Sequence, residues 1–210
     1  MTAQELFRLL PRFIESKGLK SLTLDSFPPN MTIDTAALVH ILQQSSKLTK
    51  LCLRNMDGVK SSSFEELIEI VTSIIMAGPK SLTELDLRGI GGSKEQGELI
   101  LDALIQTQIQ LTSLDISENQ TWAESQYYSD MLCEVLMKQN ELEIINLSYI
   151  FAQKQNNESL RPILHSLIES PLMDTLKSVS VLGVEWTIEE VKSMIFPLIR
   201  ATKVLEKFNF

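Results

Sequence analysis

The sequence predicts an α/β solenoid, in which short parallel strands line a concave face and helices cover the convex face. Three observations support this fold class. A six-residue pattern of the form L-x-x-L-x-L, with conservative variants, occurs seven times along the 210 residues. Its copies start 29 to 34 residues apart, and the segments between copies have the apolar spacing of amphipathic helices. The copies begin at Leu19, Leu48, Leu82, Leu111, Leu142, Leu176 and Leu205.

Each copy predicts one strand, and each spacer predicts one helix. Alternation along LTELDL places Leu82, Leu85 and Leu87 on the inward side of a strand. A Ser or Thr followed three residues later by Glu predicts a capping box at a helix start. A helix over about residues 3–16 would cap the N-terminal end. The capping pairs are Thr2 with Glu5, Ser63 with Glu66 and Thr187 with Glu190, and Gly78-Pro79 predicts a helix stop.

One strand and one helix cannot bury both of their apolar faces, so the units are expected to stack into one continuous core. The repeated pattern resembles the leucine-rich repeat proteins of the ribonuclease-inhibitor type, which have long repeats with a full helix in each. The resemblance covers nearly the whole chain. It implies one domain over residues 1–210, with about seven repeats wound into a right-handed βα superhelix, and it says little about function.

The chain departs from the family pattern at one position of the turn after each strand. The family places Asn three residues beyond the last strand leucine, where it bonds to turn backbone groups. Only Asn119 matches this pattern. We therefore expect most turns to be arranged differently and the curvature to be irregular. The equivalent positions hold Phe27, Met56, Ile90, Ile150 and Val184.

Composition excludes several classes of protein. The chain is 44% hydrophobic, which allows a packed core. Its formal net charge of −8 argues against a nucleic-acid-binding protein. Two cysteines cannot build a disulfide framework, and no segment looks like a signal peptide or a membrane span. We therefore expect an intracellular, cytoplasmic location, or the host cytoplasm if the protein is a secreted effector.

The residues that could carry chemistry do not form a catalytic or metal-binding pattern. His40 and His165 fall in predicted helices several repeats apart, and no Cys/His pair has metal-ligand spacing. Cys133 is expected in the core, whereas Cys52 is expected to be partly exposed on the concave face. No phosphate-binding glycine loop is present. The sequence thus predicts a non-enzyme with no cofactor and no metal.

The fifth and seventh positions of each pattern are expected to point out of the concave face. Arg54 and Arg88 are neighbours in the seventh column, and Asp86 and Asp115 are neighbours in the fifth. Together they predict a mixed-charge, partner-binding patch over the second to fourth strands. The alternative is a solvated face on which these residues form cross-strand ion pairs.

The loop over residues 118–130 is the most aromatic connection in the chain. Trp122 and Tyr127 are candidate partner-binding residues there, because exposed aromatic side chains often anchor protein interfaces. Trp122 is either an exposed anchor or packed under the loop.

The fold, the acidity and the lack of catalytic groups predict a scaffold that binds a partner protein through its concave face and loops. It would belong to a larger protein or to a bacterial effector. One alternative is a GTPase activator of the long-repeat leucine-rich type, with Arg54 or Arg88 near the nucleotide. The other is an architectural subunit of a large assembly. The last strand, with Leu205, Phe208 and Phe210, predicts either a longer natural chain or end-to-end association through the C-terminal edge.

Overall fold

A computed structural model describes residues 18–26, 47–55, 61–77, 81–107, 109–124, 127–151 and 159–210. The predicted cap over residues 3–16, the Gly78-Pro79 stop and His40 lie outside these ranges. So do the side chains of Ser63 and Glu66, although the helix that contains them is described.

The strands form one sheet in which all neighbours are parallel and follow the order of the chain. The short strand patterns of the sequence supply every one of these strands, and the predicted parallel α/β sheet is confirmed. The strands are β1 (Ser21–Asp25), β2 (Lys50–Arg54), β3 (Glu84–Asp86), β4 (Ser113–Asp115), β5 (Ile144–Asn146), β6 (Ser178–Ser180) and β7 (Lys207–Asn209).

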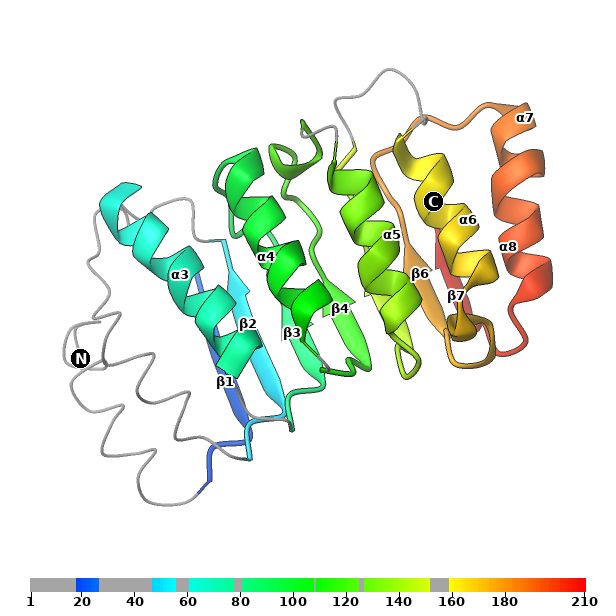
Figure 1. Cartoon of the computed structure of the whole chain (residues 1–210). Coiled ribbons are helices and arrows are strands. Elements are labelled where there is room, and N and C mark those ends of the chain that lie inside the picture. The colour runs from blue at the N-terminus through cyan, green and yellow to red at the C-terminus, as the bar shows by residue number, and fades with distance from the viewer. Residues whose placement is uncertain are drawn as a thin grey trace.

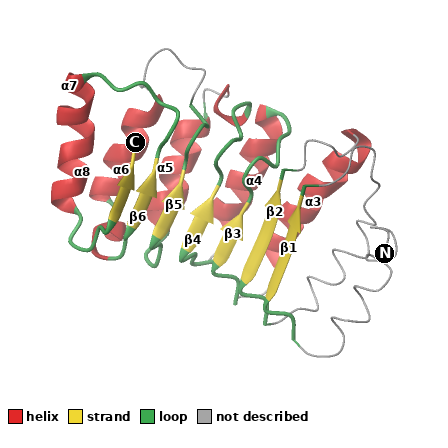
Figure 2. Cartoon of the chain, turned by 180° about the vertical axis from the view of Figure 1, so that it is seen from behind, coloured by secondary structure: helices red, strands yellow, loops and turns green. Residues whose placement is uncertain are grey.

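The described helices lie side by side on one face of this sheet (Figure 1). The opposite face, turned toward the viewer in Figure 2, is covered by no described helix. The α-helices are α3 (Ser61–Ala77), α4 (Lys94–Gln106), α5 (Tyr128–Lys138), α6 (Leu160–Glu169), α7 (Ile188–Glu190) and α8 (Phe196–Ala201). A π-helical turn (Val191–Ile195) joins α7 to α8, and short 3₁₀ turns cover Trp122–Glu124 and Pro171–Asp174. None of the described helices combines the length and the apolar character that crossing a membrane requires.

The core runs between the sheet and the helices as continuous ladders of apolar residues. The fourth pattern positions pair across neighbouring strands, as in Leu51 with Leu85 and Leu85 with Leu114. These leucines are buried, as are Ile74 of α3 and Leu101 of α4 behind them. Each buried side chain of this kind stabilises the fold by about 1.5–3 kcal/mol, so the ladders hold the repeats together.

The residue that follows the seventh position of each pattern adopts a left-handed backbone conformation. This eighth position turns the chain out of the sheet toward the next helix. Its φ angles lie between 51° and 83°, where most L-residues are disfavoured. The residues are Ser26, Asn55, Gly89, Glu118, Tyr149 and Gly183.

The next residue in the turn after β4 is Asn119, and it behaves as the resemblance implies. Its buried Nδ2 donates to the carbonyls of Leu87 and Ile116, both at 2.9 Å, and its Oδ1 accepts from the Gly91 amide at 3.0 Å. The equivalent Ile90 and Ile150 are buried apolar residues. These turns are therefore arranged without an asparagine, as the sequence predicted.

The capping box at Thr187 is confirmed, because Thr187 Oγ1 accepts from the Glu190 amide and Glu190 bonds back to the Thr187 amide. Ser93 and Gln96 form a second capping box at the start of α4 that the sequence analysis did not identify. At the last strand, the rings of Phe208 and Phe210 lie 5.5 Å apart, and Phe210 is exposed.

Candidate functional site

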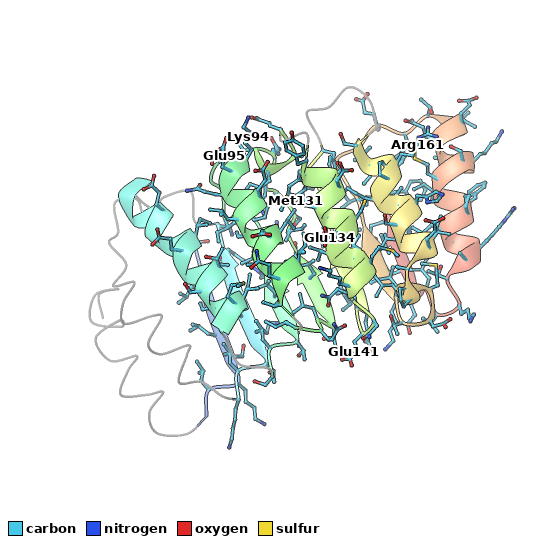
Figure 3. All side chains as sticks on the ribbon, viewed as in Figure 1. Lys94, Glu95, Met131, Glu134, Glu141 and Arg161 are labelled. Atoms are coloured by element: carbon cyan, nitrogen blue, oxygen red, sulfur yellow. The ribbon has the colours of Figure 1, made fainter. Side chains whose placement is uncertain are left out.

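The face of the sheet opposite the helices, called the open face below, carries the side chains of the third, fifth and seventh pattern positions. The sequence analysis considered only the fifth and seventh columns. The third belongs with them because side chains alternate along a strand. Its members include Lys50 and Glu84, which are paired on this face, and Ile144, which is exposed. The helical layer on the other side holds Glu95 and Glu134, labelled in Figure 3.

Cross-strand ion pairs occupy the first half of the open face. Arg54 donates to the carboxylate of Asp86 through two nitrogens. Lys50 pairs with Glu84 at 2.7 Å. The bond to Glu84 raises the pKa of Lys50, and the bond to Asp86 raises the pKa of Arg54.

The next pair along the face joins Arg88 to Glu118 at 2.7 Å. Arg54 and Arg88 are therefore each held by a carboxylate. This is the arrangement of the ion-paired alternative, and partly exposed pairs of this kind contribute only about 0–1 kcal/mol each. Nothing in it favours an arginine supplied to a nucleotide.

Asp115 takes no part in these ion pairs. Its Oδ1 accepts from the amide and the hydroxyl of Ser117, and its Oδ2 accepts from Asn146 Nδ2 at 2.9 Å. Both oxygens thus have neutral donors.

The expectation that Cys52 is partly exposed is wrong, because only 1% of the residue is accessible. Cys52 lies in register between Thr23 of β1 and Asp86 of β3. The ion pair between Arg54 and Asp86 lies next to it. Burial, followed by the nearby Asp86 carboxylate, raises the pKa of the thiol to about 11. The thiol is therefore neutral at physiological pH and a poor nucleophile.

Trp122 is not an exposed anchor, since none of its surface is accessible. Its Nε1 donates to the Gly91 carbonyl at 2.9 Å. A Cβ added at Gly97 of α4 would lie 2.5 Å from the Trp122 ring, so the absence of a side chain there makes room for the indole. The alternative interpretation, packing under the loop, is the one observed. Tyr127, by contrast, is 59% exposed.

The second half of the open face, over β5 and β6, carries no charged side chain at the third, fifth or seventh position. The hydroxyls of Ser148 and Ser180 bond to each other there at 2.8 Å, and Asn146 bonds to Asp115 of β4. Tyr149 and Leu182 remain 42% and 37% exposed at the carboxyl ends of these strands. They are adjacent, because the Tyr149 amide donates to the Leu182 carbonyl at 2.7 Å.

The sequence analysis missed Tyr149 and did not select Leu182. A signal was present, because Tyr149 is the only aromatic residue at the eighth pattern position, where other repeats have Gly, Asn, Ser or Glu. Within the described ranges, no group of three or more His, Cys, Asp or Glu side chains is placed to hold a metal ion. His165 pairs with Glu169 on α6, in the helical layer.

Comparison with known proteins identifies the fold. No protein-family model matches the chain, and no curated protein matches it. Among solved structures, the chain is similar to the tropomodulin C-terminal domain of Caenorhabditis elegans, with 14% identity and a TM-score of 0.52, over 80% of this chain and 92% of that one.

Two further structures are more distant. Leiomodin-1 actin-binding site 2 matches with 10% identity and a TM-score of 0.49, over 80% of this chain and 88% of that one. The TLR13–ssRNA13 complex matches with 16% identity and a TM-score of 0.40, over 82% of this chain and 23% of that one. Likeness at this level concerns the fold alone. The chain thus resembles the tropomodulin C-terminal domain in its overall fold.

Proposed function

We propose that this chain is a non-enzymatic module that binds a partner protein through the open face of its sheet. One observation carries the proposal. Tyr149 and Leu182, whose backbones are bonded at the carboxyl ends of β5 and β6, are 42% and 37% exposed, and the nearby hydroxyls of Ser148 and Ser180 are bonded to each other. Burying these apolar surfaces releases water, and aromatic residues are enriched where protein interfaces gain most of their binding energy. The partner would have to offer a hydrogen bond to the Tyr149 hydroxyl.

The charged half of the open face is a less favourable docking surface. A partner that bonded to Arg54 or Arg88 would have to compete with Asp86 or Glu118. We therefore place the contact over β5 and β6 and assign the ion pairs to its rim, where charges affect the rate and the specificity of association more than the affinity.

The absence of catalysis is part of the proposal. It is supported by the neutral, buried thiol of Cys52 and by the position of His165 in the helical layer. The finer architecture is also proposed, namely a right-handed superhelix of about seven long repeats of the ribonuclease-inhibitor type. The unbroken chain order of the parallel strands supports it. We place the module inside the cell, as a scaffold within a larger protein or an effector.

The test is affinity capture from cell lysate with three forms of the immobilised chain, followed by quantitative mass spectrometry. Leu182→Ser replaces the apolar side chain by the residue found at the same pattern position in Ser117 and Ser148. Leu99→Ser is the matched control, because Leu99 is 55% exposed but lies on α4. We expect the same proteins to be captured by the wild-type and Leu99→Ser chains and to be depleted at least tenfold with Leu182→Ser.

Circular dichroism must show that all three forms are folded. Equal capture by the Leu182→Ser chain would show that the open face over β6 is not the binding surface. A parallel Tyr127→Ala variant tests the loop candidate in the same way, and selective loss with that variant would move the site to the loop.

A further inference from the structure

The last helical segment of the chain, formed by α7, the π-helical turn and α8, has a described neighbour on one side only. Helix α6 packs against α5 on one side and against α8 on the other, whereas no described element covers the far side of α8 (Figures 1 and 2). We propose that this far side, called the end face below, binds a second copy of the same chain through a two-fold axis. The inference does not depend on the proposed function, because the open face belongs to the sheet.

Apolar side chains form a stripe along the end face. Ile188, Phe196 and Ile199 are all exposed. Ile188 and Phe196 are eight positions apart, and the π-helical turn lies between them. Because a π-helical turn holds more residues than an α-helical one, these two side chains are separated by about two turns, and Ile199 follows after about one more. The three side chains therefore share one side of the segment.

Burial within the same segment shows which side this is. Ile195 and Leu198 are fully buried and face the core. Met194 is buried as well, in the π-helical turn that contacts α6. Helical spacing places Phe196 and Ile199 on the flank opposite Met194, so the stripe points away from α6. Apolar side chains in this orientation are those that a neighbouring helix would cover.

Charges at the two ends of the segment favour a second copy as the occupant. Glu189 lies in the first turn of α7 and Arg200 in the last turn of α8, and both are exposed. A two-fold axis across the middle of the segment makes the two copies antiparallel, with each Glu189 opposite the Arg200 of the other copy. The surface is thus complementary to itself. Lys192 lies between Ile188 and Phe196, where its stem can extend along the stripe while its ammonium stays in water.

The outer edge of β7 is complementary to itself in the same arrangement. The Lys207 amide and the Asn209 carbonyl bond toward β6, so the N–H and C=O of Phe208 between them point away from β6. In an antiparallel pair of such edges, the two copies of Phe208 lie opposite and exchange both of these bonds. The axis that makes the helices antiparallel also makes the strands antiparallel. One dimer would therefore cover the apolar stripe and the open sheet edge together.

The test is sedimentation equilibrium of the full chain over a dilution series. We expect the mass to rise with concentration toward twice that of the monomer. Phe196→Glu places a charge in the stripe and should weaken the association at least tenfold. Met137→Glu is the matched control, because Met137 is 48% exposed and Phe196 is 46% exposed, but Met137 lies on α5, inside the row of helices. This control should associate like the wild type.

Two charge reversals test the antiparallel orientation. Glu189→Arg and Arg200→Glu each place like charges opposite one another, so each variant alone should associate more weakly than the wild type. Mixed in equal amounts, the two variants should associate with each other, because each supplies the charge that the other needs. Both substituted side chains are exposed, and circular dichroism must show that every variant is folded.

Three results would overturn the inference: a monomer mass at every concentration, undiminished association of the Phe196→Glu chain, or failure of the two mixed charge variants to associate. Self-association that is lost with Leu182→Ser and kept with Phe196→Glu would place the contact on the open face instead. Capture from lysate depends on the open face, so each of the first three results would leave the proposed function intact.

Discussion

Replacing Asn119 by alanine is expected to destabilise the fold by about 3 kcal/mol. The buried amide contacts four backbone groups. Two of these keep another partner, since the Leu87 carbonyl also accepts from Ile90 and the Ser117 carbonyl also accepts from Gly89. Within the described ranges, the Ile116 carbonyl and the Gly91 amide bond to Asn119 and to no second partner.

The magnitude follows from these two groups. An orphaned buried polar group costs about 1–3 kcal/mol. Ile116 is fully buried, so leaving its carbonyl without a partner should cost an amount in the upper part of that range. Gly91 is half-buried and its amide can bond to water instead, so the loss of this bond should cost an amount in the lower part of the range. A loss of about 3 kcal/mol lowers the melting temperature by about 6–12 °C in a chain of this size.

Urea unfolding followed by far-ultraviolet circular dichroism measures the difference in the free energy of unfolding. Asn146→Ala is the matched control, because Asn146 is half-buried on the open face, where water can replace its bonds to Asp115 and Ser117. It should cost about 1 kcal/mol or less. If Asn119→Ala costs no more than Asn146→Ala, the assignment of the turn to this asparagine is wrong.

Three further changes test other parts of the structure. Gly97→Ala should destabilise the chain by about 1–3 kcal/mol, because its Cβ would meet the Trp122 ring at 2.5 Å; an unchanged urea midpoint would contradict the packing of that ring. Thr187→Ala should cost about 1 kcal/mol through loss of the capping box, measured in the same way, with Thr187→Ser as the conservative control. In a Cys133→Ser background, Cys52 should be alkylated at pH 8 at least about tenfold more slowly in the native than in the urea-unfolded chain, because it is buried and its pKa is raised to about 11; equal rates would show an open thiol.

The strands and the core were predictable because their signal is local. The alternation of apolar and polar residues can be recognised within each L-x-x-L-x-L segment alone, and its leucines are buried in every repeat. The capping box at Thr187 is equally local, since both of its bonds join residues three apart. The strand and helix layers could therefore be assigned before any contact between repeats was known.

The errors concern contacts between repeats. Cys52 was expected to be exposed because its position alternates outward, but the Asp86 side chain of the next strand helps to cover it. For Trp122 the sequence left two alternatives, an exposed anchor or packing under the loop, and the buried indole fills the space left by Gly97 in the preceding repeat. Neither neighbour can be recognised from the segment that carries the residue, because each comes from another turn of the solenoid.

The candidate site could be predicted in part from the sequence. The sequence left open whether Arg54 and Arg88 would be available to a partner or would form cross-strand ion pairs, and each is bonded to a carboxylate. Ion pairing depends on which rotamers meet across strands that are about 5 Å apart. The patch that looked suited to a partner is thus largely satisfied within the chain, and the exposed apolar pair lies two strands further on.

A repeated backbone offers a way to separate structural from functional residues in a single sequence. The eighth pattern position adopts a left-handed backbone conformation in every described turn that follows a strand. Asn55, Gly89 and Gly183 adopt this conformation with the least strain. Tyr149 does not, and it is also exposed. A bulky side chain is strained in this conformation. Packing against Gly183 offers a structural explanation for the tyrosine, and the 42% of it that stays exposed leaves room for a binding role. If stability alone had selected Tyr149, Tyr149→Asn would lower the melting temperature; an equal or higher melting temperature together with weaker capture of the lysate partners would show that this turn has a function.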